Sequence, residues 1–234
     1  MDLKEESILG GDIDSHWYYL SKARALSSCL PRSTGNKVLD VGAGSGFFSR
    51  WLLSHGLADE ATCVDTGYAS DCDEEIDAKP LRFRREIATS DADLLLLMDV
   101  LEHVEDDAGL LRTYLDKAPP QAQAVITVPA FQFLWSHHDV FLEHHRRYTL
   151  KTLSRVVERA GAVPLRMHYY YGTIFPLVVA LRLLRPKRRA DGSDLRREPP
   201  PVNAALLAIC GLERRVMAAN RLAGLSVFCV CRKR

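Results

Sequence analysis

Short apolar runs alternate with stretches of helical spacing from residue 37 to about residue 170. This alternation is typical of βαβ units and predicts an α/β fold with a mostly parallel sheet. The run at 94–99 is almost wholly apolar, as a central parallel strand covered on both faces requires. Seven strands are expected, at residues 38–41, 61–65, 81–84, 94–99, 124–128, 163–170 and 225–231.

Helical spacing predicts helices between these strands, at residues 47–55, 109–118 and 150–160. Two further regions stand outside the alternation. Residues 15–30 are expected to form a helix with an aromatic cluster, His16-Trp17-Tyr18-Tyr19, near its start. Residues 172–220 combine an apolar helix, a loop at 185–201 rich in basic residues, and a second helix at 202–219.

We therefore expect a single domain with four parts. These are an N-terminal helical cap (1–36), an α/β core (37–170), a helical insertion (171–223) and the last strand (224–234). The insertion has three interpretations: a lid over the site, a contact in a homodimer, or a peripheral attachment to anionic lipid.

Composition narrows the class of protein. The chain has 234 residues, 47% of them apolar, with 31 Lys and Arg against 30 Asp and Glu. A net charge of +1 gives no general attraction to phosphate backbones, so we expect no nucleic-acid partner. The six cysteines form no C-x-x-C pair, and we therefore expect no metal site.

The first residues of the chain and its apolar runs indicate the cellular compartment of the protein. The first 14 residues contain five acidic side chains and do not resemble a signal peptide. No run reaches the ~20 apolar residues of a membrane-spanning helix, since the nearest, 169–184, contains Gly172, Pro176 and Arg182. These features predict a cytoplasmic protein with free thiols.

The strongest motif is a glycine-rich turn, Gly42-Ala43-Gly44-Ser45-Gly46, between the first strand of the core and a helix. Such a turn lets the backbone approach a ligand closely at the carboxyl end of a strand. A dinucleotide fingerprint would place Gly or Ala where Phe47 stands, and a P-loop would place Lys after Gly46. Nicotinamide and flavin cofactors and nucleotide hydrolysis are thus disfavoured.

Asp65 ends the second strand, 19 residues after Gly46. A carboxylate at that position can accept hydrogen bonds from both hydroxyls of a ribose lying across the turn. With this residue the chain resembles the class I S-adenosylmethionine-dependent methyltransferases. The segments Met98-Asp99-Val100-Leu101-Glu102-His103-Val104, His137-His138-Asp139 and His144-His145-Arg146-Arg147-Tyr148 extend the resemblance, over residues 15–170, to a group of small bacterial members.

The resemblance implies a Rossmann-like, doubly wound sheet of seven strands whose last strand is antiparallel, with S-adenosylmethionine as cofactor. It places the adenosyl group at the glycine turn and Asp65, the methionine end near Asp99, and the aromatic N-terminal segment over the cofactor. The residues so assigned are Asp40, Gly42, Gly44, Gly46, Phe47, Asp65, Asp99, Val100 and Tyr18.

Methyl transfer from a sulfonium needs placement of the nucleophile more than strong acid–base help. A base is required only when the acceptor carries a proton that it does not lose at neutral pH. The candidates for that base, or for orienting the acceptor, are His103, His137 and Asp139. The candidates for binding the acceptor are Tyr169, Tyr170, His144 and Arg147.

Each of these candidates also has a structural interpretation. His103 can hydrogen-bond locally at the start of a helix, and His144 and Arg147 can anchor a loop. Tyr169 and Tyr170 can fill the interface between the sheet and the insertion, which is the commoner role of such aromatic residues. The sequence leaves these alternatives open.

Three functions are compatible with these motifs. The first is methyl transfer to a small molecule, phosphorylated or linked to a lipid or sugar. The second is cyclisation or cleavage of the cofactor itself, with release of methylthioadenosine and no methyl acceptor. The third is a catalytically silent protein that binds S-adenosylmethionine. The methyl acceptor is not readable from the sequence because methyltransferases share the cofactor half and vary the rest.

Overall fold

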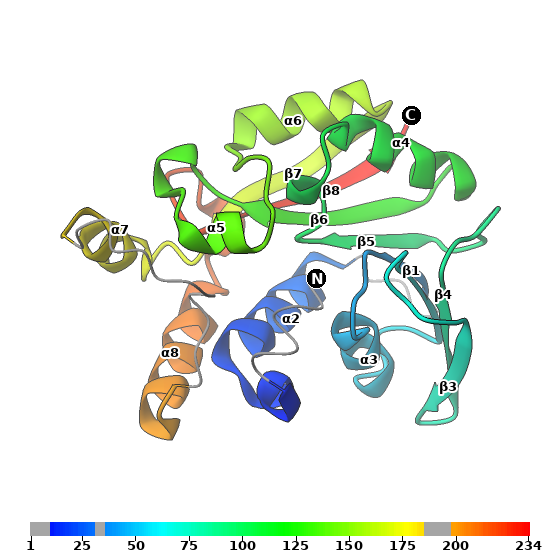
Figure 1. Ribbon diagram of the computed structural model, residues 1–234, viewed down its shortest axis with the longest axis horizontal. Coiled ribbons are helices and arrows are strands. Elements are labelled where there is room, and N and C mark those ends of the chain that lie inside the picture. The colour runs from blue at the N-terminus through cyan, green and yellow to red at the C-terminus, as the bar shows by residue number, and fades with distance from the viewer. Residues whose placement is uncertain (1–9, 31–35, 185–197) are drawn as a thin grey trace.

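The computed structural model describes residues 10–30, 36–184 and 198–234 (Figure 1). These residues contain one sheet of eight strands in the order β3-β4-β2-β1-β5-β6-β8-β7. The strands are β1 (Lys37–Val41), β2 (Glu60–Val64), β3 (Cys72–Ile76), β4 (Lys79–Arg84), β5 (Leu94–Met98), β6 (Gln123–Pro129), β7 (Ala162–Tyr170) and β8 (Ser226–Lys233).

Strand directions confirm the predicted fold class. Strands β4, β2, β1, β5 and β6 are parallel to their neighbours in that series, and β8 runs antiparallel to both β6 and β7. The carboxyl ends of β1, β2, β5 and β6 therefore meet at one edge of the sheet. In open α/β sheets this is the edge at which ligands bind.

The sheet has one strand more than the seven that were predicted. The additional strand, β3, forms an antiparallel hairpin with β4, and Asp77 and Ala78 form its two-residue turn with φ of 51° and 61°. Positive φ at both turn residues is the geometry of a type I′ turn. The strand was missed because its sequence, Cys-Asp-Glu-Glu-Ile, lies mostly exposed at the edge and shows no apolar alternation.

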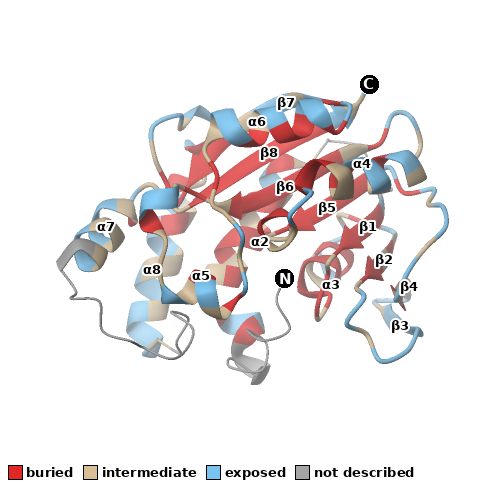
Figure 2. Cartoon of the chain, turned by 45° about the horizontal axis from the view of Figure 1, so that its top comes forward, coloured by how far each residue is buried: buried red, intermediate tan, exposed pale blue. Residues whose placement is uncertain are grey.

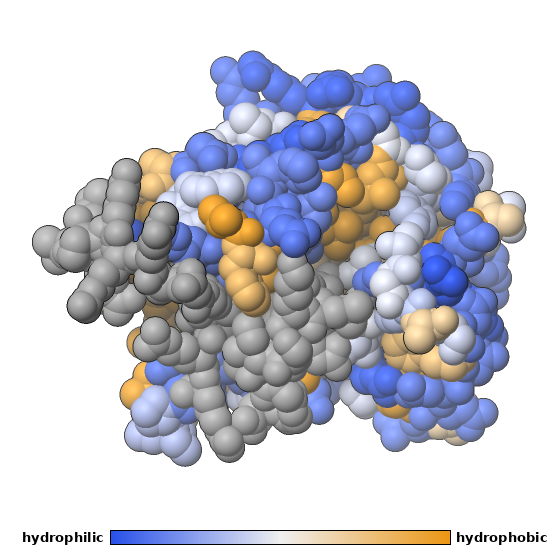
Figure 3. Space-filling view, viewed as in Figure 1, coloured by the Kyte–Doolittle hydropathy of each residue, from blue (hydrophilic) through white to orange (hydrophobic). Residues whose placement is uncertain are grey.

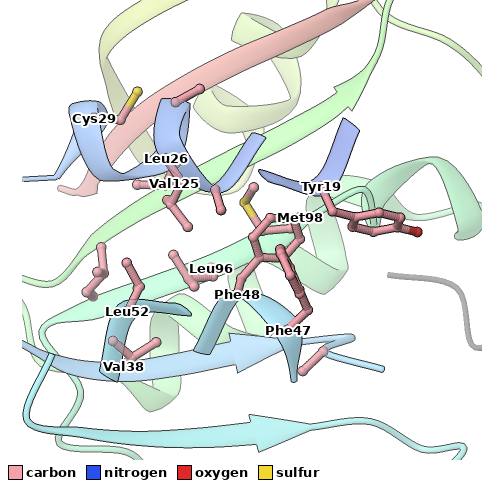
Figure 4. Packing of buried hydrophobic residues seen from close by; sticks show 14 of the residues in the cluster. Tyr19, Leu26, Cys29, Val38, Phe47, Phe48, Leu52, Leu96, Met98 and Val125 are labelled. Atoms are coloured by element: carbon pink, nitrogen blue, oxygen red, sulfur yellow. The ribbon is translucent and has the colours of Figure 1, made fainter. Parts of the chain in front are cut away.

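Helices cover both faces of the sheet. Helices α2 (Trp17–Cys29) and α3 (Phe47–Ser54) pack on one face, and α4 (Asp107–Lys117) and α6 (Leu150–Arg159) pack on the other (Figure 1). Successive side chains along β5 point to opposite faces of the sheet and therefore pack into two separate cores. Leu96 faces α2 and α3, whereas Leu97 faces α4 and α6. Figure 2 shows the buried strands between these layers, and Figure 4 shows the core under α2 and α3.

The predicted insertion lies between β7 and β8 in the chain. It contains α7 (Phe175–Leu184) and α8 (Pro200–Glu213), and the predicted basic loop between them lies almost wholly outside the described residues. Helix α8 ends earlier than the predicted residue 219; a turn and the short 3-10 helix η4 (Met217–Ala219) follow it. Residues 214–219 include no Gly or Pro that would have marked this end in the sequence.

Helix α8 packs against the N-terminal helix. The side chain of Asn203 in α8 accepts a hydrogen bond from the backbone N–H of Trp17 at 2.8 Å and donates one to the carbonyl of Ser15 at 3.0 Å. These bonds satisfy polar groups at the start of α2, where backbone N–H groups lack partners within the helix. The insertion is thereby tied to the start of α2.

Candidate functional site

The glycine turn follows β1 at the ligand-binding edge of the sheet. Gly42, Gly44 and Gly46 all have positive φ, between 55° and 74°, a conformation that residues with a side chain rarely adopt. A Cβ atom on Gly42 would lie 2.9 Å from Cγ2 of Val100, so the missing side chain lets Val100 pack against the turn. This contact brings the segment after β5 against the segment after β1.

Asp65 lies directly after β2, beside this turn. Its Oδ2 accepts a hydrogen bond from the N–H of Gly44 at 3.1 Å, and its Oδ1 accepts one from the N–H of Gly67 at 2.9 Å. Each carboxylate oxygen can accept a second bond, and the side chain is partly exposed. Asp65 therefore keeps the capacity to bind the two hydroxyls of a ribose while it holds the turn in place.

Asp40 and Phe47 lie beneath the turn and not on its surface. Asp40 is 1% exposed, and its Oδ2 accepts a hydrogen bond from the hydroxyl of Ser49 at 2.9 Å. Burial raises the pKa of Asp40 to about 6. Phe47 is 5% exposed and meets the ring of Tyr19 edge to face, with centroids 5.5 Å apart (Figure 4). Both side chains support the turn from the core.

Asp99 lies directly after β5. The resemblance to methyltransferases predicts that the methionine end of the cofactor binds near this residue. Its φ is 56°, and its Oδ1 accepts a hydrogen bond from the hydroxyl of Thr127 at 3.0 Å. The ammonium of Lys22 in α2 forms an ion pair with Oδ2 of Asp99. Burial raises and the charge of Lys22 lowers the pKa of Asp99, and the net shift is downward. Asp99 thus stays ionised at neutral pH.

Lys22 is a site residue that sequence reasoning missed. It is fully buried, and its Nζ lies 2.5 Å from the hydroxyl of Tyr18 and 4.4 Å from the centre of that ring. Tyr18 in turn stacks on Tyr171 with ring centroids 5.5 Å apart. The available signal was the spacing of Tyr18 and Lys22, which puts both on one face of a helix. Their partner Asp99 is 77 positions away from Lys22, and only the fold reveals it.

A second polar cluster follows Asp99 in the chain. It consists of Glu102 and His103 in the 3-10 helix η2 (Leu101–His103) and His144 in a loop after the short helix α5 (His137–Phe141). One potential ligand atom of each lies within 4.8 Å of the other two. Burial, reinforced by the charge of Asp99, raises the pKa of Glu102 well above its usual value. Sequence reasoning singled out both histidines but not the glutamate that joins them in space.

Asp139 is fully buried, and both of its carboxylate oxygens form hydrogen bonds. Its Oδ1 lies 3.0 Å from Nδ1 of His144 and 2.6 Å from Nε of Arg147, and its Oδ2 accepts a bond from Nη2 of Arg147 at 3.0 Å. Burial alone would raise the pKa of Asp139, but the bonds from His144 and Arg147 bring it well below its usual value. A carboxylate with so low a pKa is a weak proton acceptor, and its contacts position His144 and Arg147 instead.

The other predicted residues have contacts of their own. His137 lies at the start of α5. Tyr169 and Tyr170 are buried in different cores, as neighbours in a strand must be. The hydroxyl of Tyr169 accepts a bond from the N–H of Leu150 at 3.3 Å, and that of Tyr170 donates one to the carbonyl of Cys210 at 3.1 Å. These bonds tie Tyr169 to the start of α6 and Tyr170 to α8.

A known protein family and several solved structures are similar to this chain. The sequence matches the protein family described as "Methyltransferase domain" over residues 15–166, which include the glycine turn, Asp65, Asp99 and the cluster around His144. No curated protein sequence matches the chain.

Solved structures share the fold at low sequence identity. An S-adenosylmethionine-dependent methyltransferase from Mesorhizobium loti is 17% identical, with a TM-score of 0.55 over 94% of this chain and 100% of the other. Phosphoethanolamine N-methyltransferase 2 from Haemonchus contortus, in complex with S-adenosyl-L-methionine, is 12% identical, with a TM-score of 0.58 over 100% and 60%. A chain of the Haloferax volcanii complex between the Trm112 methyltransferase activator and a putative methyltransferase is 15% identical, with a TM-score of 0.58 over 95% and 92%.

Proposed function

Because this chain belongs to the family of methyltransferase domains, we propose that it transfers a methyl group from S-adenosylmethionine to a small-molecule acceptor bound beside Asp99 and His103. The cofactor supplies a methyl group on a positively charged sulfur, which is an activated leaving group. The residues of the chain then have two tasks: to bind the cofactor in one orientation and to hold the acceptor in line with the methyl group.

One observation carries the proposal: an ion pair between the buried Lys22 and Asp99, whose side chain is 25% exposed, lies at the same sheet edge as the glycine turn and Asp65. The amino-acid end of S-adenosylmethionine carries one carboxylate and one ammonium. In our proposal Lys22 binds the carboxylate and Asp99 binds the ammonium, while Asp65 accepts hydrogen bonds from the ribose. The donor set therefore fits the cofactor at both of its polar ends.

The acceptor end of the site contains His103. Of the three predicted candidates for a base, His137 lies on α5 and Asp139 is bound to Arg147 and His144. His103 remains close to Asp99 in the chain, and its ring centroid lies 4.7 Å from that of His144. These placements support His103 as the residue that meets the reacting group of the acceptor.

Binding of S-adenosylhomocysteine tests the ribose assignment. Asp65→Ala removes two hydrogen bonds and should weaken binding by ~2–4 kcal/mol. Asp59→Ala is the matched control, because Asp59 is an exposed carboxylate just before the amino end of β2. Calorimetry that shows equal affinity for the two variants, with both melting like the parent protein, would disprove the assignment.

A second ligand isolates the role of Lys22. Lys22→Met should weaken S-adenosylhomocysteine binding ~10–100-fold, since it removes a charge-assisted hydrogen bond. It should leave the binding of methylthioadenosine unchanged, because that nucleoside has no carboxylate. Asp65→Ala should weaken the binding of both. A variant at Lys22 that weakens both ligands equally contradicts the proposed orientation.

Product analysis separates methyl transfer from the two alternatives. The protein is incubated with S-adenosylmethionine alone and with a panel of small-molecule acceptors, and the adenosyl product is identified. Methyl transfer gives S-adenosylhomocysteine only when an acceptor is present. Methylthioadenosine formed without an acceptor would indicate cleavage of the cofactor, and tight binding with no product in any arm would indicate a silent binding protein.

We further propose that the acceptor is phosphorylated or linked to a lipid, and that α7 and α8 meet it at a lipid surface. Both helices expose large apolar side chains, among them Leu177 at 59% and Leu212 at 63%. In the sequence, six basic residues stand between the two helices, at positions 185, 187, 188, 189, 196 and 197. Apolar helices with adjacent basic residues suit attachment to anionic lipid.

A further inference from the structure

Glu102 is a buried carboxylate with no hydrogen-bond partner in the part of the chain that the structure describes. Its side chain is fully buried, and neither Oε1 nor Oε2 is hydrogen-bonded. Burial of an ionised carboxylate without a partner costs several kcal/mol, so such groups in proteins take up a proton, form a pair or bind a cation. A cation bound to Glu102 would supply the partner that the described side chains do not.

The neighbouring charges are already balanced. Lys22 pairs with Asp99, and Arg147 pairs with Asp139. The other two members of the cluster, His103 and His144, are imidazoles that can each present a nitrogen lone pair. A cation that displaces the proton of Glu102 therefore meets one negative charge and two neutral donors.

We propose that Glu102, His103 and His144 bind one divalent transition-metal ion of the zinc type. One potential ligand atom from each residue lies within 4.8 Å of the other two, which is a separation that three ligands around one ion can adopt after small side-chain movements. Two imidazoles and one carboxylate favour zinc or a similar ion over Mg²⁺ and Ca²⁺, which prefer oxygen ligands. Three protein ligands leave a coordination position open.

The surroundings of His144 support a metal ligand. Its Nδ1 is bonded to the buried carboxylate of Asp139, so Nε2 is the nitrogen left to coordinate an ion. A carboxylate behind a ligating histidine fixes the ring orientation and raises the basicity of the ligand nitrogen. Asp139 is itself held by Arg147 and by the N–H of Ser136 at 2.7 Å.

Hydrogen bonds to the backbone hold the ligand-bearing segments together before an ion binds. The N–H of His145 donates to the carbonyl of Glu102 at 2.7 Å, and the hydroxyl of Tyr148 donates to the carbonyl of Leu101 at 3.1 Å. These bonds join η2 to the loop that carries His144. The three ligands are thus positioned by the fold and require no large movement to meet an ion.

The role of the ion rests on the proposed function and changes the part of His103 in it: as a ligand, His103 acts on the acceptor through the ion and not as a free base. Two of the ligands, Glu102 and His103, follow Asp99 closely in the chain, and the open position of the ion could take a hydroxyl of the acceptor and lower the pKa of that hydroxyl. The hydroxyl proton passes to solvent, and the oxygen then forms a bond to the methyl carbon. The bond between that carbon and sulfur breaks, and its electron pair stays on sulfur, giving S-adenosylhomocysteine and the methyl ether.

Zinc binding to the full chain tests the site without any activity assay. The protein is freed of metal with a chelator and titrated with Zn²⁺ by calorimetry, in a Cys72→Ser background that removes the exposed thiol. We expect one ion per chain. Glu102→Gln, His103→Gln and His144→Gln should each weaken binding by ~100-fold or more, and Asp139→Asn by ~10–100-fold.

His55→Gln is the matched control, since His55 is exposed at the end of α3, away from the cluster. It should leave zinc binding unchanged. Co²⁺ replacing Zn²⁺ should give a visible spectrum without thiolate charge-transfer bands, and this readout does not depend on the stability of any variant. No binding at one ion per chain, binding that survives all three substitutions, or a thiolate spectrum would each overturn the proposal.

These outcomes are independent of the cofactor test. Failure of zinc binding with intact S-adenosylhomocysteine binding would leave the proposed methyl transfer standing and remove only the ion. Failure of S-adenosylhomocysteine binding in the parent protein would instead remove the proposed function, whatever the zinc result.

Discussion

Asp40 shows how a single buried side chain ties the glycine turn to the stability of the protein. It is 1% exposed, and the hydroxyl of Ser49 donates the hydrogen bond to its carboxylate. Desolvation raises the pKa of Asp40 to about 6, above the value of about 4 in an unfolded chain. The folded state therefore binds a proton that the unfolded state has released between about pH 4 and pH 6.

This difference predicts a pH-dependent effect of Asp40→Asn. As pH rises from about 4 to 6, the free energy of unfolding of the parent protein falls, because ionised Asp40 is disfavoured in the folded state. The penalty is complete above pH 6 and amounts to at most about 3 kcal/mol. Asn keeps an oxygen for Ser49 and carries no charge, so the variant should be more stable than the parent at pH 8.

Urea denaturation at pH 5 and pH 8 measures this effect. The stabilisation by Asp40→Asn should be larger at pH 8 than at pH 5. Asp59→Asn, at an exposed position near the amino end of the neighbouring strand, should show no such pH dependence. Equal stabilisation by Asp40→Asn at the two pH values contradicts a raised pKa.

At the residue scale, the sequence predicts site residues that lie close together in the chain. The glycine turn and Asp65 are recognisable because glycine spacing and a strand-end carboxylate lie within a short stretch. Lys22 and Glu102 are not recognisable in this way. Their significance comes from Asp99 and His144, which the sheet and the loop after α5 bring beside them.

Glu213 connects the two helices of the insertion, because it lies at the end of α8 and binds the segment that leads into α7. It is 6% exposed at the end of α8, and its carboxylate accepts bonds from the N–H groups of Gly172 and Thr173 at 2.6 and 3.0 Å. It also accepts a bond from the hydroxyl of Thr173 at 2.6 Å. Because α7 begins shortly after these residues, Glu213 sets how the chain leaves β7 and enters α7.

Glu213→Ala should reduce the free energy of unfolding by ~2–4 kcal/mol, since it leaves partly buried backbone N–H groups without acceptors. Glu158→Ala removes an exposed carboxylate of α6 that accepts one bond from Ser154. That control should change stability by no more than ~0.5 kcal/mol. Urea denaturation compares the two, and equal losses would show that Glu213 has no anchoring role.

At the element scale the sequence predicts what is buried and periodic. Strand β5 is recognisable because all its residues are buried and apolar. Strand β3 is not, because an edge hairpin needs no apolar face and its type I′ turn uses Asp77-Ala78 in place of the Asn-Gly that signals such turns. The end of α8 was misplaced because residues 214–219 contain no Gly or Pro that would mark it.

In the described residues, the apolar helices of the insertion lie on the side of the molecule opposite the hairpin of β3 and β4. The hairpin of β3 and β4 lies at the right of the molecule in Figure 1, and α7 and α8 lie at the left. Figure 3 shows hydrophobic side chains at the lower left of this face, where α8 lies in Figure 1. None of the helices in the described residues is long and apolar enough to cross a membrane. The exposed apolar side chains of α7 and α8 thus form an apolar end of the molecule, opposite the hairpin of β3 and β4.

The proposed attachment to lipid predicts binding to anionic vesicles through the apolar end. Leu177 and Leu181 are 59% and 43% exposed and lie one turn apart on α7, on the same face of the helix. Leu177→Gln combined with Leu181→Gln should weaken binding to phosphatidylglycerol-containing vesicles ~10-fold or more, because both leucines would leave the lipid phase. Co-sedimentation of the full chain with the vesicles measures the change.

The control variant combines Val163→Thr and Leu165→Gln, which remove exposed apolar surface from β7 while leaving α7 intact. It should bind the vesicles like the parent. Vesicles of phosphatidylcholine alone, or added salt, should release the protein, since each basic residue near an anionic surface contributes only ~1 kcal/mol and is screened. If the leucine substitutions instead convert a dimer to a monomer in light scattering and leave vesicle binding unchanged, α7 is a contact between two copies of the chain and not a lipid-binding element.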